Sequence, residues 1–375
     1  MRKHQQFPQK PINKNQKSIM LIALAVTAVL IVLLFSGAFG SSKRSMSANQ
    51  LRCVVTQNVT PFGNSVLYYD GLTLFCLNSR GGERWSYPLG ENASFSCSDK
   101  VVAAWSGTQL HIINQDGHST YNENLADEIQ FARVGSRYVG VVLGDGISPS
   151  LVIKDMQGTS IDNETVAYED KVILDVGFFG DGEYLWTTSM DVYGTNPTTI
   201  MHTFRINLSN SGEIDLGENL PYAIIYAGNE LNVISTRQLR QYDYRGTQDT
   251  SGTQLVYGWQ LVDHSVNGNQ AMLLFAPSRQ IENSSSINQL RLLNGSVDKR
   301  FTLPSACIGA MLYNKRVYAF SSDVLYRADV NGQRFNAISL PSALNNKPIT
   351  GFLGLLNNGV ALVTSDNDVY TVTLP

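Results

Sequence analysis

The sequence predicts an all-β fold, an eight-bladed β-propeller preceded by one transmembrane helix. Two observations carry the propeller prediction. From residue 50 onwards, short apolar runs alternate with turn pairs such as Asp-Gly, Ser-Gly and Asn-Gly, which supply the positive φ of tight hairpins. These runs also form a larger unit that recurs every ~35–48 residues, the spacing expected of four-stranded propeller blades.

The first predicted element is an uncharged stretch over residues 19–40, rich in Leu, Ile, Val and Ala. About 20 apolar residues in a helix cross the hydrocarbon core of a bilayer, so we expect a transmembrane helix over residues 18–40. Basic residues are more numerous before this stretch than after it, which predicts a cytoplasmic N-terminus. A cleaved signal peptide is the alternative, because Ser36-Gly37-Ala38 offers a small-residue cleavage site.

The flanking segments complete the predicted domain organisation. Residues 1–17 are basic, Gln-rich and Pro-containing, so we expect a disordered cytoplasmic tail. Residues 41–49 form a short stalk, and residues 50–375 form the propeller outside the cytoplasm. The expected location is therefore the cell membrane, with a single pass through the bilayer.

The third strand of each blade, with the turn after it, is the clearest part of the repeat. Seven copies begin at Leu74, Leu110, Leu151, Phe204, Leu239, Leu290 and Leu325. Three more strands follow, which leaves the eighth blade one strand short, while residues 51–55 form an extra strand before the first repeat. Because an open propeller leaves exposed strand edges, we expect this N-terminal strand to complete the eighth blade. Seven blades, with the ends paired differently, is the alternative.

Residues 74–89 carry a specific resemblance to a known repeat. An apolar strand, a turn from Asn78 to Gly81, and Trp85 shortly before Tyr87 resemble the PQQ-like propeller repeat. That resemblance implies that Trp85 packs between neighbouring blades, although the other repeats lack the Trp. Taken whole, the chain resembles the membrane-anchored propeller proteins of Firmicutes grouped as DUF5711. This implies the architecture and an envelope location, and it implies no activity.

Charge and cysteine content argue against several classes of protein. The net charge is −3 and there is no basic stripe, so nucleic acid is not an expected partner. Cys53, Cys76, Cys97 and Cys307 are too few for a disulfide scaffold and match no zinc-site spacing. Cys53 with Cys307, or Cys76 with Cys97, could form disulfides in an oxidising compartment, but we expect buried free thiols.

No pattern of residues in the chain predicts a catalytic site. His111, His118, His202 and His264 lie in different repeats without HxH or HExxH spacing, so no metal site is expected. No G-x-S-x-G element is present. The quinone-dependent dehydrogenases combine repeated docking tryptophans with adjacent cysteines, and this chain has one such Trp and no adjacent cysteines. We expect no enzymatic activity and no cofactor; a propeller hydrolase or oxidoreductase is an alternative.

Two longer polar segments, residues 189–199 and 277–288, are expected as hairpin tips between the second and third strands of their blades. Loops on a rigid frame often carry function. The candidate partner-binding residues on these tips are Tyr193, Asn196, Arg279 and Glu282.

We therefore expect a non-catalytic binding or scaffolding module of the cell envelope that engages a protein partner. The alternative is a module that binds cell-wall glycan. The Tyr-rich segment at residues 242–245, expected on an outer strand, is a candidate glycan-binding surface.

Overall fold

The computed structural model describes residues 45–144, 146, 149–164, 168–180, 182–207, 210–278 and 286–375. The chain divides into two compact units, and every strand below belongs to the unit Ser47–Leu374. The other unit, Met1–Met46 with Pro375, lies almost wholly outside the described residues, as does the predicted transmembrane helix at residues 18–40. Among the residues described, no helix is both long and apolar enough to span a bilayer.

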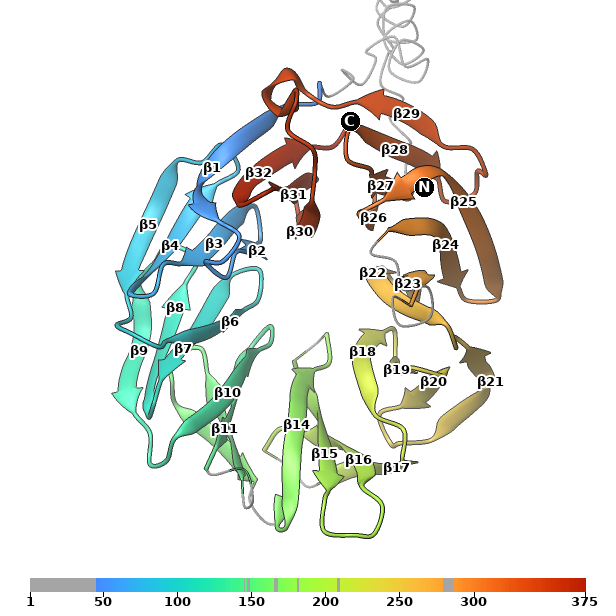
Figure 1. Ribbon diagram of the computed structural model, residues 1–375. Helices are drawn as coiled ribbons and strands as arrows, with labels where there is room; N and C mark the ends of the chain where they lie inside the picture. The colour runs from blue at the N-terminus through green and yellow to red at the C-terminus, as the bar shows by residue number, and fades with distance from the viewer. Residues whose placement is uncertain are drawn as a thin grey trace, which may run out of the picture. The chain divides into compact units, whose positions relative to one another are not determined.

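The described strands form eight antiparallel sheets of four strands each, which are arranged as blades around a central axis (Figure 1). Within each blade the first strand lies innermost. Blade 1 contains β2 (Thr60–Phe62), β3 (Ser65–Tyr69), β4 (Thr73–Asn78) and β5 (Glu83–Pro88). Blade 2 contains β6 (Ser94–Cys97), β7 (Val101–Ser106), β8 (Gln109–Asn114) and β9 (Ser119–Asn124). Blade 3 contains β10 (Ile129–Val134), β11 (Tyr138–Leu143), β12 (Ser150–Asp155) and β13 (Ser160–Glu164).

The remaining blades follow the same order along the chain. Blade 4 contains β14 (Lys171–Phe178), β15 (Tyr184–Asp191), β16 (Thr198–Arg205) and β17 (Asn210–Gly217). Blade 5 contains β18 (Pro221–Ala227), β19 (Glu230–Ser235), β20 (Gln238–Asp243) and β21 (Gln248–Leu255). Blade 6 contains β22 (Trp259–Asn267), β23 (Gln270–Pro277), β24 (Ile287–Asn294) and β25 (Val297–Cys307).

The last two blades contain the helical turn and the joining of the chain ends. Blade 7 contains β26 (Gly309–Tyr313), β27 (Arg316–Phe320), β28 (Val324–Asp329) and β29 (Asn336–Ser339). A short 3-10 helix, η2 (Ser342–Leu344), leads into blade 8, which contains β30 (Gly351–Leu356), β31 (Val360–Ser365), β32 (Asp368–Thr373) and β1 (Ala48–Val54).

The ring closes where the two ends of the propeller meet. β1 pairs antiparallel with β32, so that Ala48 lies opposite Val372 and Val54 lies opposite Asp368. The backbone N–H of Thr373 also donates to the carbonyl of Ser47 at 2.8 Å. The predicted eighth blade, completed by the N-terminal strand, is confirmed, and the seven-bladed alternative is wrong. The reason is physical, because this pairing covers the edge of β32 that would otherwise lack a partner strand.

Buried apolar side chains gather between neighbouring blades rather than in one central core. Leu51 and Leu362 of blade 8, for example, share a cluster with Val66 and Leu77 of blade 1. Neighbouring blades cover both faces of each four-stranded sheet. Its middle strands therefore carry continuous apolar runs instead of alternating apolar and polar residues. Every residue of β31 is buried for this reason.

The outer strand of one blade packs on a glycine turn of the next. The indole Nε1 of Trp85 in β5 donates to the carbonyl of Gln115 at 2.9 Å, and a Cβ on Gly117 would lie only 2.5 Å from the indole ring. Tyr121 in β9 meets Gly158 in the same way, with the hypothetical Cβ 1.9 Å from its ring. Trp85 therefore packs between blades, and in the next repeat a tyrosine takes the place of the Trp.

Candidate functional site

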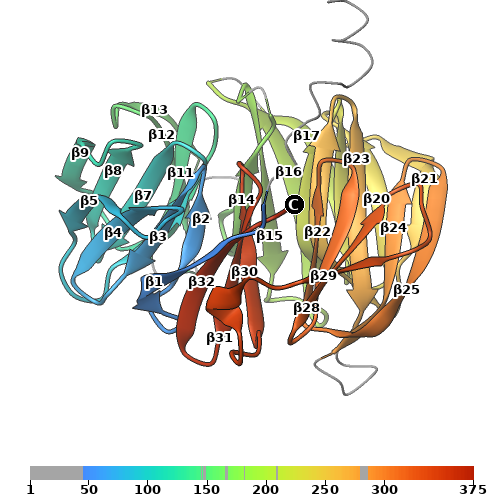
Figure 2. The same ribbon diagram turned by 90° about the horizontal axis from the view of Figure 1, so that it is seen from above.

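The antiparallel order of the strands gives the propeller two chemically distinct faces. Turns between the second and third strands, and connections from one blade to the next, emerge on one side, which we call the connection face. Turns between the first and second strands, and between the third and fourth, emerge on the other side, which we call the turn face. Figure 2 shows the strands running between these two faces.

Exposed large apolar side chains are distributed unequally between the two faces. Within the described residues, two of them lie at the turn face, Val266 near the end of β22 and Val297 at the start of β25. Eight lie at the connection face: Val54, Leu72, Val192, Tyr193, Leu220, Tyr222, Leu255 and Tyr257. Six of these eight belong to three consecutive blades, and we call this set the blade 4–6 patch: Val192, Tyr193, Leu220, Tyr222, Leu255 and Tyr257.

The hairpin between β15 and β16 supplies two of the predicted partner-binding residues. The side chain of Tyr193 is 61% exposed, and its backbone N–H donates to Oδ1 of Asp191 at 2.9 Å, which fixes the turn. Nδ2 of Asn196 donates to Oε1 of Glu218 at 3.2 Å, so Asn196 joins the hairpin to the connection that leads to blade 5. The structure thus places Tyr193 and Asn196 together on the connection face.

The second predicted hairpin lies between β23 and β24 of blade 6. Arg279 and Glu282, the two candidate residues on it, lie outside the described residues. Pro277 and Ser286, on either side of that segment, are described and lie at the connection end of the blade.

Tyr222 links the patch to the inner strand of blade 6. Its hydroxyl accepts a hydrogen bond from the backbone N–H of Leu261 at 3.0 Å, and burial raises the pKa of this phenol. Tyr222 occupies a bulge in β18 between Pro221 and Ala223. A bulge re-aims a side chain out of the regular strand alternation. Tyr222 therefore presents part of its ring at the surface while its hydroxyl is held against the neighbouring blade.

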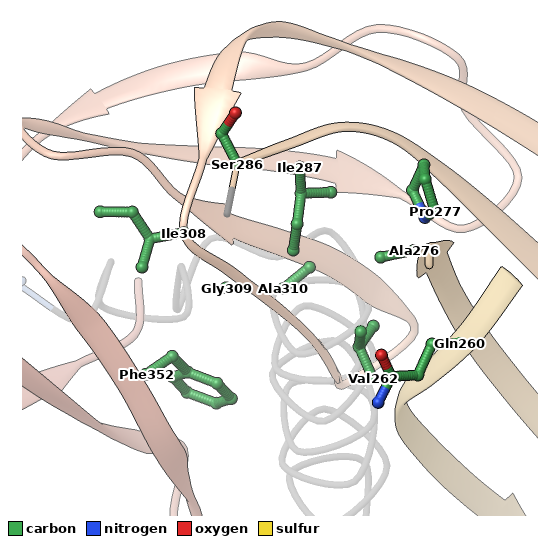
Figure 3. Close-up of a pocket in the computed structure, with 10 residues that line it drawn as sticks. All are labelled: Gln260, Val262, Ala276, Pro277, Ser286, Ile287, Ile308, Gly309, Ala310 and Phe352. Carbon is green, nitrogen blue, oxygen red and sulfur yellow. The ribbon is translucent and has the colours of Figure 1, made fainter. Parts of the chain in front are cut away.

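A pocket of about 360 Å³ lies at the connection ends of blades 6, 7 and 8 (Figure 3). None of its lining residues is charged, and most of their side chains are apolar. Figure 3 shows the ring of Phe352 and the side-chain amide of Gln260 facing each other across it. The lining residues are Gln260, Val262, Ala276, Pro277, Ser286, Ile287, Ile308, Gly309, Ala310 and Phe352.

A larger depression, of about 650 Å³, lies on the turn face of blades 2 to 4. Its charged lining residues are Asp99, Lys100 and Arg133, and the guanidinium of Arg133 is paired with the carboxylate of Asp175, with Nε to Oδ1 at 2.8 Å. The exposed apolar residues of the turn face, Val266 and Val297, belong to blade 6 and do not border it. This depression therefore combines charged groups with apolar side chains, among them Val134, Val176 and Phe178.

The buried histidines lie in separate blades. Nδ1 of His111 in β8 lies 3.2 Å from the hydroxyl of Tyr87, and burial lowers the pKa of this imidazole. His202 in β16 lies with Nε2 3.3 Å from Glu213, and its pKa is lowered chiefly by burial, with Glu213 opposing. Across the part of the chain that the structure describes, no three His, Cys, Asp or Glu side chains come together as metal ligands would.

The cysteine thiols are not poised for nucleophilic chemistry. All four are free, and burial raises the pKa of Cys53 and Cys76 to about 11 and that of Cys97 and Cys307 to about 12. The thiolate is the reactive form, so a raised pKa keeps these thiols inert. The expectation of free thiols is confirmed.

The Tyr-rich segment does not form the outer surface that the sequence suggested. Tyr242 belongs to β20, the third strand of blade 5, and is buried, while Tyr244 lies half-buried in the following turn. The assignment to an outer strand was wrong, because the apolar run ends at the turn and the polar strand begins only at Gln248.

Sequence reasoning missed most of the patch and the whole pocket. Leu220 and Tyr257 sit in short connections between blades, where a single apolar residue beside Asn, Pro or Gly gives little periodic signal. The pocket draws its walls from β22, β23, β24, β26 and β30, which belong to three different blades. An exposed Leu or Tyr in a blade connection is the one signal that could have indicated this face.

Comparison with known proteins supports the fold. No protein-family model and no curated protein matches this chain. Among solved structures, the C-terminal WD40 domain of Sif2 is similar at a TM-score of 0.58 and 10% identity, over 88% of this chain and 98% of that one. Sqt1 from Saccharomyces cerevisiae is similar at a TM-score of 0.56 and 10% identity, over 88% of this chain and all of the other (100%). These likenesses define the class of protein, a β-propeller, and extend no further at such low identity.

Proposed function

We propose that this chain is a non-catalytic binding or scaffolding module that engages a protein partner through its connection face. The observation that carries the proposal is that, of the ten exposed large apolar side chains among the described residues, eight lie on that face. Exposed apolar patches rimmed by polar residues are typical of protein–protein contact sites. Three of the six patch residues are tyrosines, which are enriched at interfaces because they combine apolar area with a polar tip.

The frame beneath the patch suits recognition. The backbone N–H of Leu261 holds the hydroxyl of Tyr222, and Glu218 holds the side chain of Asn196, so these two side chains are positioned before a partner arrives. A preorganised surface loses less side-chain entropy on binding and therefore keeps more of its contact energy.

A non-catalytic role is favoured by the scattering of the reactive groups. His111 and His202 are buried in different blades, and neither lies in the pocket of Figure 3. A general base or nucleophile must lie within hydrogen-bonding reach of its substrate and its partner groups.

The cellular setting is also a proposal and rests on the sequence. The uncharged stretch at residues 18–40 and the basic residues before it support a membrane tether with the propeller outside the cytoplasm. The resemblance to the DUF5711 propellers and to PQQ-like repeats points the same way. Protease digestion of intact cells tests this topology, because only a propeller outside the membrane is accessible to added protease.

The test of the binding proposal compares the two faces. Tyr193→Asp with Tyr257→Asp places charges on the connection face, and Val266→Asp with Val297→Asp places the same charges on the turn face. After crosslinking of the full chain in its native cells, mass spectrometry should show one dominant envelope protein with the wild type and the turn-face variant. The connection-face variant should lose that protein. Equal capture by both variants, or no dominant protein with the wild type, would overturn the proposal.

A further inference from the structure

We propose that the protein partner presents Lys or Arg side chains beside apolar ones and binds across the connection face. Its basic side chains would lie over the connections of blades 1 to 4, and its apolar ones on the blade 4–6 patch. The inference deepens the proposed function and rests on it. It commits to a basic polypeptide surface as the occupant, rather than an acidic protein, a lipid surface or a glycan.

Exposed acidic side chains gather in the first half of the connection face. In the described segments that join strands on this face between Asp70 and Leu220, seven exposed residues are acidic and none is basic. The nearest basic residue along the chain, Lys171, opens β14 and is half-buried. The seven lie in or directly after blades 1 to 4, which follow one another around the ring (Figure 1). We call this set the acidic arc: Asp70, Glu91, Asp127, Glu128, Glu169, Asp170 and Glu218.

The other connections show that this charge belongs to one region of the propeller. On the connection face of blades 5 to 8, the described segments between strands carry two acidic and two basic residues: Asp323, Asp366, Arg237 and Lys347. On the turn face, the described segments carry three acidic residues, Asp99, Asp116 and Glu183, and six basic ones, Arg80, Lys100, Arg137, Arg245, Lys315 and Arg334. The net charge of −3 therefore conceals an acidic connection face opposite a basic turn face.

The carboxylates of the acidic arc are available to a partner. None of the seven forms an ion pair with a described Lys or Arg side chain. Exposed charges of one sign add their fields over roughly a Debye length, about 8 Å at physiological ionic strength. A basic partner surface is attracted by this field and an acidic one is repelled, so the acidic arc selects the partner and speeds its association.

The acidic arc and the blade 4–6 patch meet at the connection between blades 4 and 5. Glu218 of the acidic arc and Leu220 of the patch are two positions apart in this segment, and both are exposed. Oε1 of Glu218 also accepts a hydrogen bond from Nδ2 of Asn196, in the hairpin that carries Tyr193. A partner that covers both regions must therefore place basic side chains next to apolar ones, the combination of an apolar centre and a charged rim.

A matched pair of charge reversals tests the inference on the native partner. Asp127→Lys, Glu128→Lys and Glu169→Lys together reverse part of the acidic arc. Asp99→Lys, Asp116→Lys and Glu183→Lys make the same change in net charge on the turn face. After crosslinking of the full chain in its native cells, the acidic-arc variant should lose the dominant envelope protein and the turn-face variant should retain it. Equal capture by the two variants would overturn the inference.

Isosteric substitutions serve if the reversed acidic arc fails to fold. Asp127→Asn, Glu128→Gln and Glu169→Gln remove the same three charges while keeping the size of each exposed side chain. They should reduce capture of the same envelope protein, to a smaller extent than the Lys substitutions. Capture equal to that of the wild type would contradict the role given to the acidic arc.

A second experiment uses defined peptides on the full chain in an uncharged detergent. Two acetylated, amidated peptides of equal length share Leu and Phe at the same positions and carry either Lys or Glu at all others. The Lys peptide should bind about tenfold or more tighter than the Glu peptide, and the acidic-arc variant should remove most of this preference. Raising NaCl from about 0.05 to about 0.3 M should weaken the Lys peptide several-fold. Binding of neither peptide, equal binding of both, or the same loss with the turn-face variant would overturn the inference.

A neutral truncation separates the apolar contribution from the charge. Tyr257→Ala should weaken the Lys peptide while leaving its dependence on salt unchanged, because it removes apolar area and no charge. If Tyr257→Ala binds the Lys peptide as tightly as the wild type does, the patch is not part of the surface that the basic partner covers, and the inference is wrong.

The two proposals fail in different ways. If partner capture is lost with the Tyr193→Asp, Tyr257→Asp variant and retained with the acidic-arc variant, the binding function stands and the basic partner is wrong. If the two face variants that test the proposed function capture the same proteins, the proposed function is wrong, and this inference falls with it whichever peptide binds.

Discussion

The hydroxyl of Tyr222 accepts a hydrogen bond from the backbone N–H of Leu261 at 3.0 Å, which joins the start of blade 5 to the inner strand of blade 6. Leu261 adjoins a bulge in β22, between Leu261 and Asp263, where the regular strand pairing shifts. A backbone donor at such a position needs a partner from outside the ladder. Tyr222 supplies that partner and at the same time contributes 42% of its surface to the connection face.

Tyr222→Phe should lower the free energy of unfolding by about 1–2 kcal/mol, because the Leu261 N–H loses its acceptor while the ring is retained. Urea unfolding of the variant and the wild type measures the change. Tyr257→Phe is the matched control, because that side chain is 65% exposed. Equal effects of the two substitutions would contradict the role given to Tyr222.

Gly158→Ala should destabilise the propeller by about 1–3 kcal/mol more than Gly90→Ala does. Both glycines have nearly the same positive φ, +83° and +84°, so the backbone strain of an alanine is equal at the two positions. A Cβ on Gly158 would lie 1.9 Å from the ring of Tyr121, whereas a Cβ on Gly90 would meet nothing within 4 Å. Thermal unfolding of both variants isolates the contact between blades 2 and 3, and indistinguishable melting temperatures would argue against it.

Leu51→Ala tests the closure of the ring. Leu51 lies in β1, is 4% exposed and packs in the cluster between blades 8 and 1, so its truncation should cost about 2–5 kcal/mol. Val54→Ala on the same strand should cost well under half of that, because Val54 is 37% exposed. Guanidinium unfolding compares the two. A small loss for Leu51→Ala would mean that β1 does not close the last blade in solution.

Stability should fall with acidification below about pH 6.5, because burial lowers the pKa of His111. In that range the unfolded chain binds a proton that the folded protein binds only at lower pH. The stability gained by keeping His111 neutral is therefore complete above about pH 6.5 and is lost as the pH falls toward the lowered pKa, by at most ~1.4 kcal/mol per pH unit. His202, whose pKa is also lowered by burial, adds to the same trend.

His111→Gln should flatten this pH dependence, and His118→Gln, at an exposed position in the turn after β8, is the matched control. Urea midpoints between about pH 7.5 and 5 provide the measurement. The interpretation fails if the slope of stability against pH is the same in His111→Gln as in the wild type.

The cysteines should resist alkylation in the folded protein. Burial raises the pKa of Cys97 to about 12 and that of Cys76 to about 11, so little thiolate is present at pH 8. A thiol reagent should label none of the four within minutes under native conditions and all four in denaturant. Rapid labelling of a single native cysteine would identify a local opening of the blade that carries it.

Much of the fold could be predicted because its signals are local. The third strands starting at Leu74, Leu110 and Leu151 each carry an apolar run and a glycine turn, and all three are third strands in the structure. The site was harder to predict. Tyr193 and Asn196 stood out because their hairpin is long, but Tyr222 and Leu255 look like ordinary strand residues until the bulge and the blade order place them at the surface.

The sequence by itself determined the strand content, the repeat and the completion of the last blade by an N-terminal strand, because alternation, turn residues and chain ends are properties of neighbouring positions. Only the tertiary structure decided which residues share a face. Leu255 and Phe352 are almost a hundred positions apart in the sequence, yet both lie at the connection face. They do so because, in antiparallel blades, every second connection between strands emerges on that side. The patch and the pocket therefore arise from the packing of consecutive blades side by side, which brings together connections that no local pattern relates.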